Sequence, residues 1–211
     1  MSLSVQQAKD LITKLKEKEI ALGRFPETWY AYENHVYGAA NVAQTIAAKI
    51  KDMNPEKVYI SALLHDISRT EEDREKRFHG LLGYEKLIDK DEAAARSAIL
   101  HMFPWNKISS FANCSKMFYN NKKDYDFVAS YLQSTKPTDT DLLIQLADSL
   151  ANKNGIVTLE QRAKEYSERH RVEIPQEVIQ PRYELKTYFD KKVGCNIYNL
   201  FTKLPTPTRE R

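Results

Sequence analysis

The residues with the clearest chemical potential are His65 and Asp66, which stand side by side near the end of an apolar run over residues 60–67. Removing water from a carboxylate and an imidazole together is costly unless another interaction compensates for it. A bound cation would compensate, because aspartate supplies a hard oxygen ligand and histidine a nitrogen ligand. A buried histidine with an aspartate hydrogen-bonded to its ring or to a helix end is the alternative that this dipeptide leaves open.

Four further residues of ligand type lie on or beside segments with a helical pattern: His35, His79, His101 and Asp148. Small residues precede His101 on its helix face, so another element can approach the imidazole closely. Asp148 lies in a narrow polar stripe of a helix predicted over residues 138–152, which would face either a polar cavity or solvent. His35 ends a buried stripe, where a core histidine bonded to a backbone carbonyl is the simpler interpretation. None of these residues identifies a metal site by itself.

Apolar spacing predicts the helices that must position these residues. An amphipathic covering helix is expected over residues 3–22, and a second helix from about 34 to 53. Asn54 and Pro55 are typical of a helix start and predict an almost wholly apolar helix that ends near the His-Asp pair. The dipole of that helix favours a cation at its C-terminal end. Asp91 is the expected N-cap of a further helix.

The C-terminal part also has a helical pattern. A capping-box sequence at Thr158 predicts a helix to about residue 169, and a last helical region is expected over residues 175–193, interrupted by Pro181. The tail, residues 205–211, is expected to be disordered. Strand-like alternation is not convincing anywhere, so the pattern predicts an all-α fold.

Two segments lack a regular pattern. Residues 68–78 form a charged connector of mixed sign, which is typical of solvated surface. Residues 105–137 interleave aromatic residues with lysines. Such a composition can stack a base and hold phosphates, or can form a loop over a small hydrophobic cluster. Long connections of this kind are often functional lids. The lysines considered for phosphate binding are Lys107, Lys116, Lys122 and Lys123.

The overall composition limits the class of protein. A chain of 211 residues suits a single domain, and a net charge of +3 fits a local anion site better than a surface that coats nucleic acid. No apolar run is long enough to cross a bilayer, and the polar N-terminus does not resemble a secretory signal. Cys114 and Cys195 match no metal or redox spacing. A protein of the reducing cytoplasm is therefore expected.

The order of His35, His65-Asp66 and Asp148 resembles that of the HD superfamily of metal-dependent phosphohydrolases. Arg69 follows the pair as a basic residue often does in that family. The resemblance covers about residues 26–152 and implies a compact all-α core there. With the covering helix at 3–22 and C-terminal helices at about 158–201, the chain is expected to form one domain.

His79 and His101 are similar to the extra ligands of HD proteins that bind two metals, among them the bacterial symmetrical diadenosine tetraphosphate hydrolases. The segment around His101 also resembles a group of uncharacterised bacterial HD proteins. The resemblance implies one ion on the first group and a second ion bridged by Asp66. The ligands so implied are His35, His65, Asp66 and Asp148 for the first ion, and Asp66, His79 and His101 for the second.

The resemblance also implies an activity. This activity is the hydrolysis of a phosphate ester or anhydride in a nucleotide or dinucleotide. The attacking water would be activated by one or two divalent transition metal ions. Iron or manganese is favoured over magnesium, zinc, nickel or cobalt. Asp66 would be catalytic, and Arg69 would stabilise phosphoryl charge, with the four lysines on distal phosphate. A homodimer, and no membrane or nucleic-acid partner, is expected. The alternatives are an HD-type di-iron oxygenase and a metal-bound sensing module without turnover.

Overall fold

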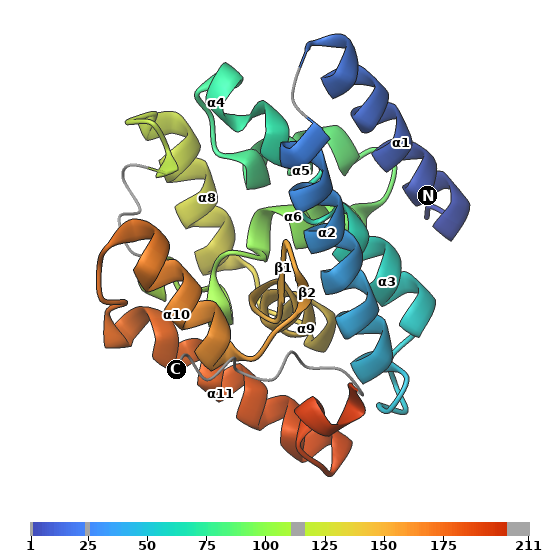
Figure 1. Ribbon diagram of the computed structural model, residues 1–211, viewed down its shortest axis with the longest axis vertical. Coiled ribbons are helices and arrows are strands. Elements are labelled where there is room, and N and C mark those ends of the chain that lie inside the picture. The colour runs from blue at the N-terminus through green and yellow to red at the C-terminus, as the bar shows by residue number, and fades with distance from the viewer. Residues whose placement is uncertain (1, 24–25, 111–116, 202–211) are drawn as a thin grey trace, which may run out of the picture.

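The computed structural model of the chain describes residues 2–23, 26–110 and 117–201, and within them it is almost entirely helical (Figure 1). This confirms the all-α class. The helices are α1 (Val5–Ala21), α2 (Pro26–Ala47), α3 (Pro55–Leu64), α4 (Glu72–Glu75), α5 (His79–Leu87), α6 (Glu92–Leu100), α8 (Lys122–Ser134), α9 (Asp139–Ser149), α10 (Leu159–His170) and α11 (Gln176–Val193). Short 3-10 turns are η1 (Arg69–Glu71), η2 (Pro104–Asn106), η3 (Ile108–Ser110) and η4 (Ile197–Leu200).

Helix α3 lies at the centre of the core. The side chain of Asn54 caps it by accepting hydrogen bonds from the backbone N–H groups of Glu56 and Lys57, at 3.0 and 3.1 Å. Every residue from Val58 to Leu64 is buried, and the helix contacts α1, α2, α6 and α9. Because this helix ends at Leu64, the His-Asp pair that follows it is carried into the middle of the molecule.

Helix α2 begins earlier than the sequence pattern predicts. It runs from Pro26 to Ala47 rather than from about residue 34 to 53, because the buried side chains of Trp29 and Tyr32 continue its inward stripe toward the N-terminus. His35 therefore lies within the helix, beside its long contact with α3, and not at the end of the stripe.

Helices α5 and α6 pack closely against each other. A Cβ atom on Gly80 would lie 2.7 Å from the carbonyl oxygen of Ala98 and 2.4 Å from the ring of Phe78, so only glycine fits between the two helices. This close approach brings His79, the first residue of α5, next to His101, which caps the C-terminal end of α6.

The structure corrects three predictions about local structure. Residues 105–137 are not irregular throughout, because α8 is capped by Asn121 and buries Val128 and Leu132. The predicted helix over 138–152 ends at Ser149, and the next residues form a two-residue antiparallel hairpin, β1 (Ala151–Asn152) with β2 (Gly155–Ile156). The connector 68–78 is not wholly solvated, since it contains α4 and two buried glutamates. Two-residue strands leave no periodic pattern in a sequence, and the buried stripe of α8 is short and includes the charged Asp124.

Helices α10 and α11 lie along the lower edge of Figure 1. The capping box predicted at Thr158 is present, and Pro181 is accommodated inside α11. Helix α11 packs against α9 and buries Leu185 and Phe189. The predicted tail 205–211 and Lys116 lie outside the described residues. Among the described helices none combines the length and apolarity needed to span a bilayer.

An ion-pair cluster centred on the buried Glu71 joins α1 to the segments around α4 and α5. Lys18 donates a hydrogen bond to one oxygen of Glu71, at 2.7 Å, and Lys86 donates to the other, at 2.6 Å. Burial raises the pKa of Glu71, but these two hydrogen bonds outweigh it and lower the pKa from 4.5 to about 2. The carboxylate of Glu71 therefore stabilises the folded state at neutral pH.

Glu71→Gln is expected to lower the free energy of unfolding at pH 7 by about 2 kcal/mol, because two charge-assisted hydrogen bonds are weakened. The unfolded chain protonates this carboxyl near pH 4.5 and the folded chain only near pH 2, so the stabilisation is complete at neutral pH and is lost between these values. Urea denaturation of metal-free protein should therefore give wild-type and variant stabilities that converge as the pH falls. A difference that persists undiminished at pH 2 would contradict this assignment.

The matched control for this comparison is Asp126→Asn. Asp126 also accepts a lysine hydrogen bond, from Lys122 at 2.5 Å, but both side chains are more than half exposed. Exposed pairs of this kind contribute little, so the control should change the free energy of unfolding by less than about 0.5 kcal/mol.

Candidate metal centre

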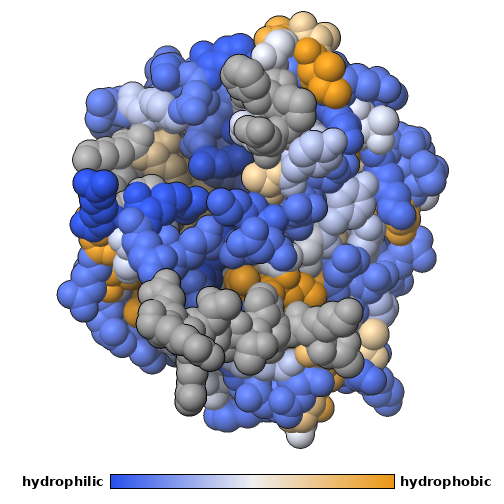
Figure 2. All heavy atoms as spheres, viewed as in Figure 1, coloured by the Kyte–Doolittle hydropathy of each residue, from blue (hydrophilic) through white to orange (hydrophobic). Residues whose placement is uncertain are grey.

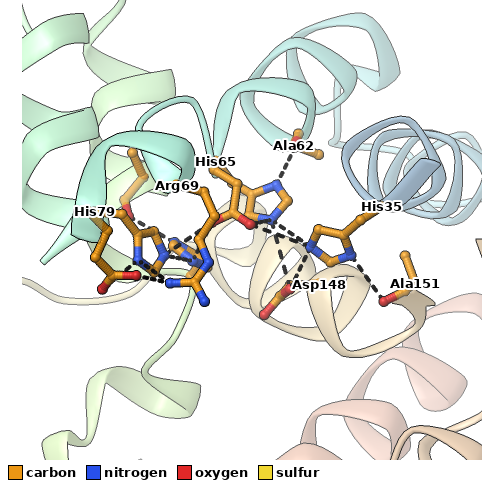
Figure 3. Close-up of polar contacts among 11 residues, drawn as sticks. His35, Ala62, His65, Arg69, His79, Asp148 and Ala151 are labelled. Carbon is orange, nitrogen blue, oxygen red and sulfur yellow. Dashed lines mark hydrogen bonds and ion pairs between the residues drawn. The ribbon is translucent and has the colours of Figure 1, made fainter. Parts of the chain in front are cut away.

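Three helices bring together the first group of candidate ligands. His35 comes from α2, His65 and Asp66 follow the end of α3, and Asp148 lies in the last turn of α9 (Figure 3). The Nε2 atom of His35 lies 3.3 Å from Nε2 of His65 and 3.2 Å from Oδ1 of Asp148. Oδ2 of Asp66 lies 3.6 Å from Nε2 of His35 and 3.7 Å from Nε2 of His65.

The second group shares Asp66 with the first. Oδ1 of Asp66 lies 3.1 Å from Nε2 of His79 and 3.3 Å from Nε2 of His101, and these two nitrogens are 3.2 Å apart. All three side chains are almost completely buried. The single carboxylate of Asp66 thus points one oxygen at each pair of histidines.

Backbone carbonyls fix the tautomers of three of these histidines. The Nδ1 atoms of His35, His65 and His101 lie 3.1, 2.6 and 2.8 Å from the carbonyl oxygens of Ala151, Ala62 and Ala98, respectively. A carbonyl oxygen can only accept, so in the neutral imidazole Nδ1 carries the proton and Nε2 presents a lone pair. When both rings are neutral, the Nε2 lone pairs of His35 and His65 therefore face each other, whereas a proton on Nε2 of His35 would be donated to Asp148.

A carboxylate orients the fourth histidine. Oε1 of Glu72 lies 3.2 Å from Nδ1 of His79, which leaves Nε2 of that ring facing Asp66. Arg69 forms an ion pair with the same glutamate, and its Nη1 lies 3.3 Å from Nδ1 of His79. A carboxylate behind a histidine in this way holds the ring of a metal ligand and raises its basicity. Sequence reasoning missed Glu72, because nothing in the pattern distinguishes it from its acidic neighbours.

The protonation states suit a cation. Burial lowers the pKa of the His65 imidazole to about 4, so this side chain is neutral at pH 7. Burial would raise the pKa of the Asp66 carboxyl, but His65 and His79 hold it well below its usual range. Burial opposes ionisation of Asp148 as well, and the hydrogen bond with His35 outweighs it and lowers that pKa. Both aspartates are therefore ionised, and the His65 imidazole beside them is neutral.

The same atoms are poorly satisfied without an ion. The Nε2 lone pairs repel each other at 3.2 to 3.3 Å, and Oδ1 of Asp66 is a buried atom with no hydrogen-bond partner among the described residues. A divalent ion in each group would relieve both problems, and mixed imidazole and carboxylate donors suit transition metals. The residues present therefore fit one ion on His35, His65 and Asp66, with Asp148 beside them as a further candidate ligand, and a second ion on Asp66, His79 and His101.

A comparison with protein families agrees with this geometry. The HD domain family model matches residues 32–153, which is more than half of the chain. The chain belongs to the HD domain family. No curated protein and no solved structure matches it. Both candidate metal groups lie inside the matched part of the HD domain, and HD domains are a superfamily of metal-dependent phosphohydrolases.

A cavity of about 740 Å³ opens onto the metal groups of the HD domain. The residues at its floor include His35, Asp66, His79, His101 and Asp148, with Arg69 beside them. The opposite wall comes from α10 and α11, which follow the segment matched by the family model. The C-terminal helices therefore shape the space in front of the metal ligands.

Those lysines predicted to hold phosphate that the structure describes do not line this cavity. Lys107, Lys122 and Lys123 are absent from its walls, and Lys122 pairs with Asp126 on the exposed face of α8. The basic side chains that do line it, besides Arg69, are Lys153, Arg162, Arg169 and Arg182. Sequence reasoning missed these arginines. Their spacing along α10 and α11 is the one signal they leave, and the sequence does not show that these helices face the metal ligands.

Proposed function

We propose that this protein hydrolyses a phosphate ester or anhydride of a small phosphorylated substrate, with nucleotides and dinucleotides as the favoured class. The observation that carries the proposal is the convergence of four histidine Nε2 atoms on the two oxygens of Asp66, at the floor of a cavity. That arrangement offers two adjacent sites for divalent ions, and phosphoryl transfer depends on such positioning and charge stabilisation more than on covalent chemistry.

Divalent ions bound there supply an acidified water and a Lewis acid for the phosphoryl oxygen. Asp66 contributes to both groups, so it fixes their separation. Glu72 holds the ring of His79 and the guanidinium of Arg69 in place. We propose iron or manganese as the favoured ions, in keeping with the mixed nitrogen and oxygen donors.

Arg69 is the side chain placed to receive the charge of the reacting phosphoryl group. About half of its side chain is exposed, it lines the cavity, and its guanidinium lies beside the second group of ligands. Guanidinium donors match the geometry of phosphate oxygens. A volume of about 740 Å³ is within the range of small-molecule sites and is large enough for a nucleotide.

The deciding experiment is phosphate release from a panel of nucleoside mono-, di- and triphosphates and dinucleotides, by protein loaded with manganese or with iron. Asp66→Ala is the blank. Release by the wild type alone is the expected result. If no compound of the panel releases phosphate with either metal, the proposal is contradicted. Substrate-dependent oxygen uptake by the iron-loaded protein would then indicate an oxygenase, and ligand binding without turnover would indicate a sensing module.

A further inference from the structure

Helix α10 is not held in place by an apolar face. Of its residues with described side chains only Leu159, the first, is buried, whereas ordinary surface helices bury a whole stripe. Arg162, Tyr166 and Arg169 follow one another at helical spacing, and all three line the cavity, together with Leu159, Ala163 and Glu165 of the same helix. The side of α10 that a packed helix would use for core contacts is thus turned toward the space above the metal ligands.

Arg182 of α11 completes this wall. Its guanidinium donates a hydrogen bond to the carbonyl of Val178, one turn earlier, which holds the side chain along the helix. Burial lowers the pKa of Arg182, the carboxylate of Asp148 opposes that change, and the charge of Arg162 adds to it. The two arginines therefore lie within electrostatic reach of each other and of a metal ligand. Arg162 itself makes a long ion pair with Glu165, at 3.6 Å.

The charges around the cavity do not balance once ions are bound. Five basic side chains line it: Arg69, Lys153, Arg162, Arg169 and Arg182. Four acidic side chains line it: Asp66, Asp148, Glu165 and Glu173. Two of the acidic residues are candidate metal ligands, whose charge divalent ions would more than neutralise. Like charges that line one partly desolvated cavity repel each other, and a bound anion would relieve that repulsion.

Hydrophilic residues cover the part of the molecular face where α10 lies (Figure 2). Next to the arginines, the segment joining α10 to α11 adds an apolar part to the cavity wall through Val172, Ile174 and Pro175. A wall with cationic and apolar parts side by side suits a ligand that carries anionic groups at one end and an uncharged group at the other.

We propose that Arg162, Arg169 and Arg182 form a second anion-binding site, which holds a phosphate group of the substrate other than the one that is hydrolysed. This inference rests on the proposed function and narrows it. The favoured substrate class is a compound with two or more phosphate groups, such as a nucleoside polyphosphate or a phosphate-bridged dinucleotide, in preference to a nucleoside monophosphate. Planar guanidinium groups bind phosphate oxygens in pairs, which gives both affinity and orientation.

Calorimetric titration of the metal-free protein with inorganic tripolyphosphate tests the site without any turnover. Removal of metal is required, because tripolyphosphate chelates divalent ions. The wild type is expected to bind tripolyphosphate at least tenfold more tightly than orthophosphate. Arg162→Gln and Arg169→Gln are each expected to weaken tripolyphosphate binding about tenfold, the loss of one charge-assisted pair. Affinity should also fall steeply with salt.

Lys164→Gln is the matched control, since it removes one positive charge from the same helix. Lys164 is exposed, pairs with Glu168 and does not line the cavity. Its affinity for tripolyphosphate should remain within about twofold of the wild type. Equal affinities in the wild type and both arginine variants, or an equal loss in the control, would overturn the proposal. Circular dichroism of each variant checks that α10 is retained.

A kinetic comparison separates this inference from the proposed function. In the metal-loaded protein, Arg162→Gln should reduce kcat/KM for a nucleoside triphosphate at least tenfold more than for the corresponding monophosphate. Equal reductions for the two substrates would overturn the second site and leave the hydrolase intact. If the wild type releases phosphate from neither substrate, but tripolyphosphate binding is still lost in the arginine variants, the anion site stands and the proposed function fails.

Discussion

Asp66→Ala is expected to bind neither of the two divalent ions and to lose phosphate release by more than about 100-fold. Residues that merely surround a metal ligand typically contribute 10- to 100-fold, and Asp66 is a ligand common to both groups. Its two oxygens lie 3.1 to 3.7 Å from the Nε2 atoms of four histidines. Without this carboxylate, the second group retains only two imidazoles and the first retains one carboxylate.

The measurements for Asp66→Ala are metal content after dialysis against manganese or iron, and phosphate release under the conditions used for the wild type. Asp89→Ala, which removes a carboxylate from the exposed end of the turn after α5, is the matched control and should bind both ions. The fold should survive Asp66→Ala, since this substitution removes a buried charge and adds none. Full turnover, or two retained equivalents of metal, would show that Asp66 is not the shared ligand.

His101→Ala is expected to lose one of the two metal equivalents and to keep the other. Nε2 of His101 faces Oδ1 of Asp66 and Nε2 of His79, at 3.3 and 3.2 Å, and has no such approach to Asp148. The first group would keep its complete set of side chains. Metal analysis should therefore give about one equivalent, with phosphate release strongly reduced because one of two charge-stabilising ions is gone.

His35→Ala is the complementary variant, since it removes a ligand of the first group only and should also retain about one equivalent. The double variant, His35→Ala with His101→Ala, should retain neither ion with an affinity comparable to that of the wild type. If His101→Ala and His79→Ala both still carry two equivalents, the two-metal arrangement is wrong, whatever their effect on turnover. Loss of both ions from His101→Ala alone would instead show that the groups bind cooperatively as one unit.

Several features follow from short stretches of sequence. The helix that begins after Asn54 is determined locally, because the cap residue and the apolar residues behind it act within a few positions of one another. The same holds for the capping box at Thr158. The all-α class and membership of the HD domain family also follow from the sequence. The candidate ligands His65 and Asp66 also follow from residue type, because burying an imidazole and a carboxylate at the end of an apolar helix has a desolvation cost that another interaction must offset.

Tertiary structure decided which side chains share a space. Glu72 lies behind His79 only because the chain folds back through α4. The inward positions of α8, which are four residues apart, include the charged Asp124, so its apolar stripe is short and only the packing shows which face is buried. The lysines described within residues 105–137 carry the same charge as the arginines on α10, yet of these two sets only the arginines line the cavity. Sequence patterns report each helix's own inward face, whereas the partner of that face depends on long-range packing. Here the packing placed a polar helix face above the metal ligands, which no local pattern could specify.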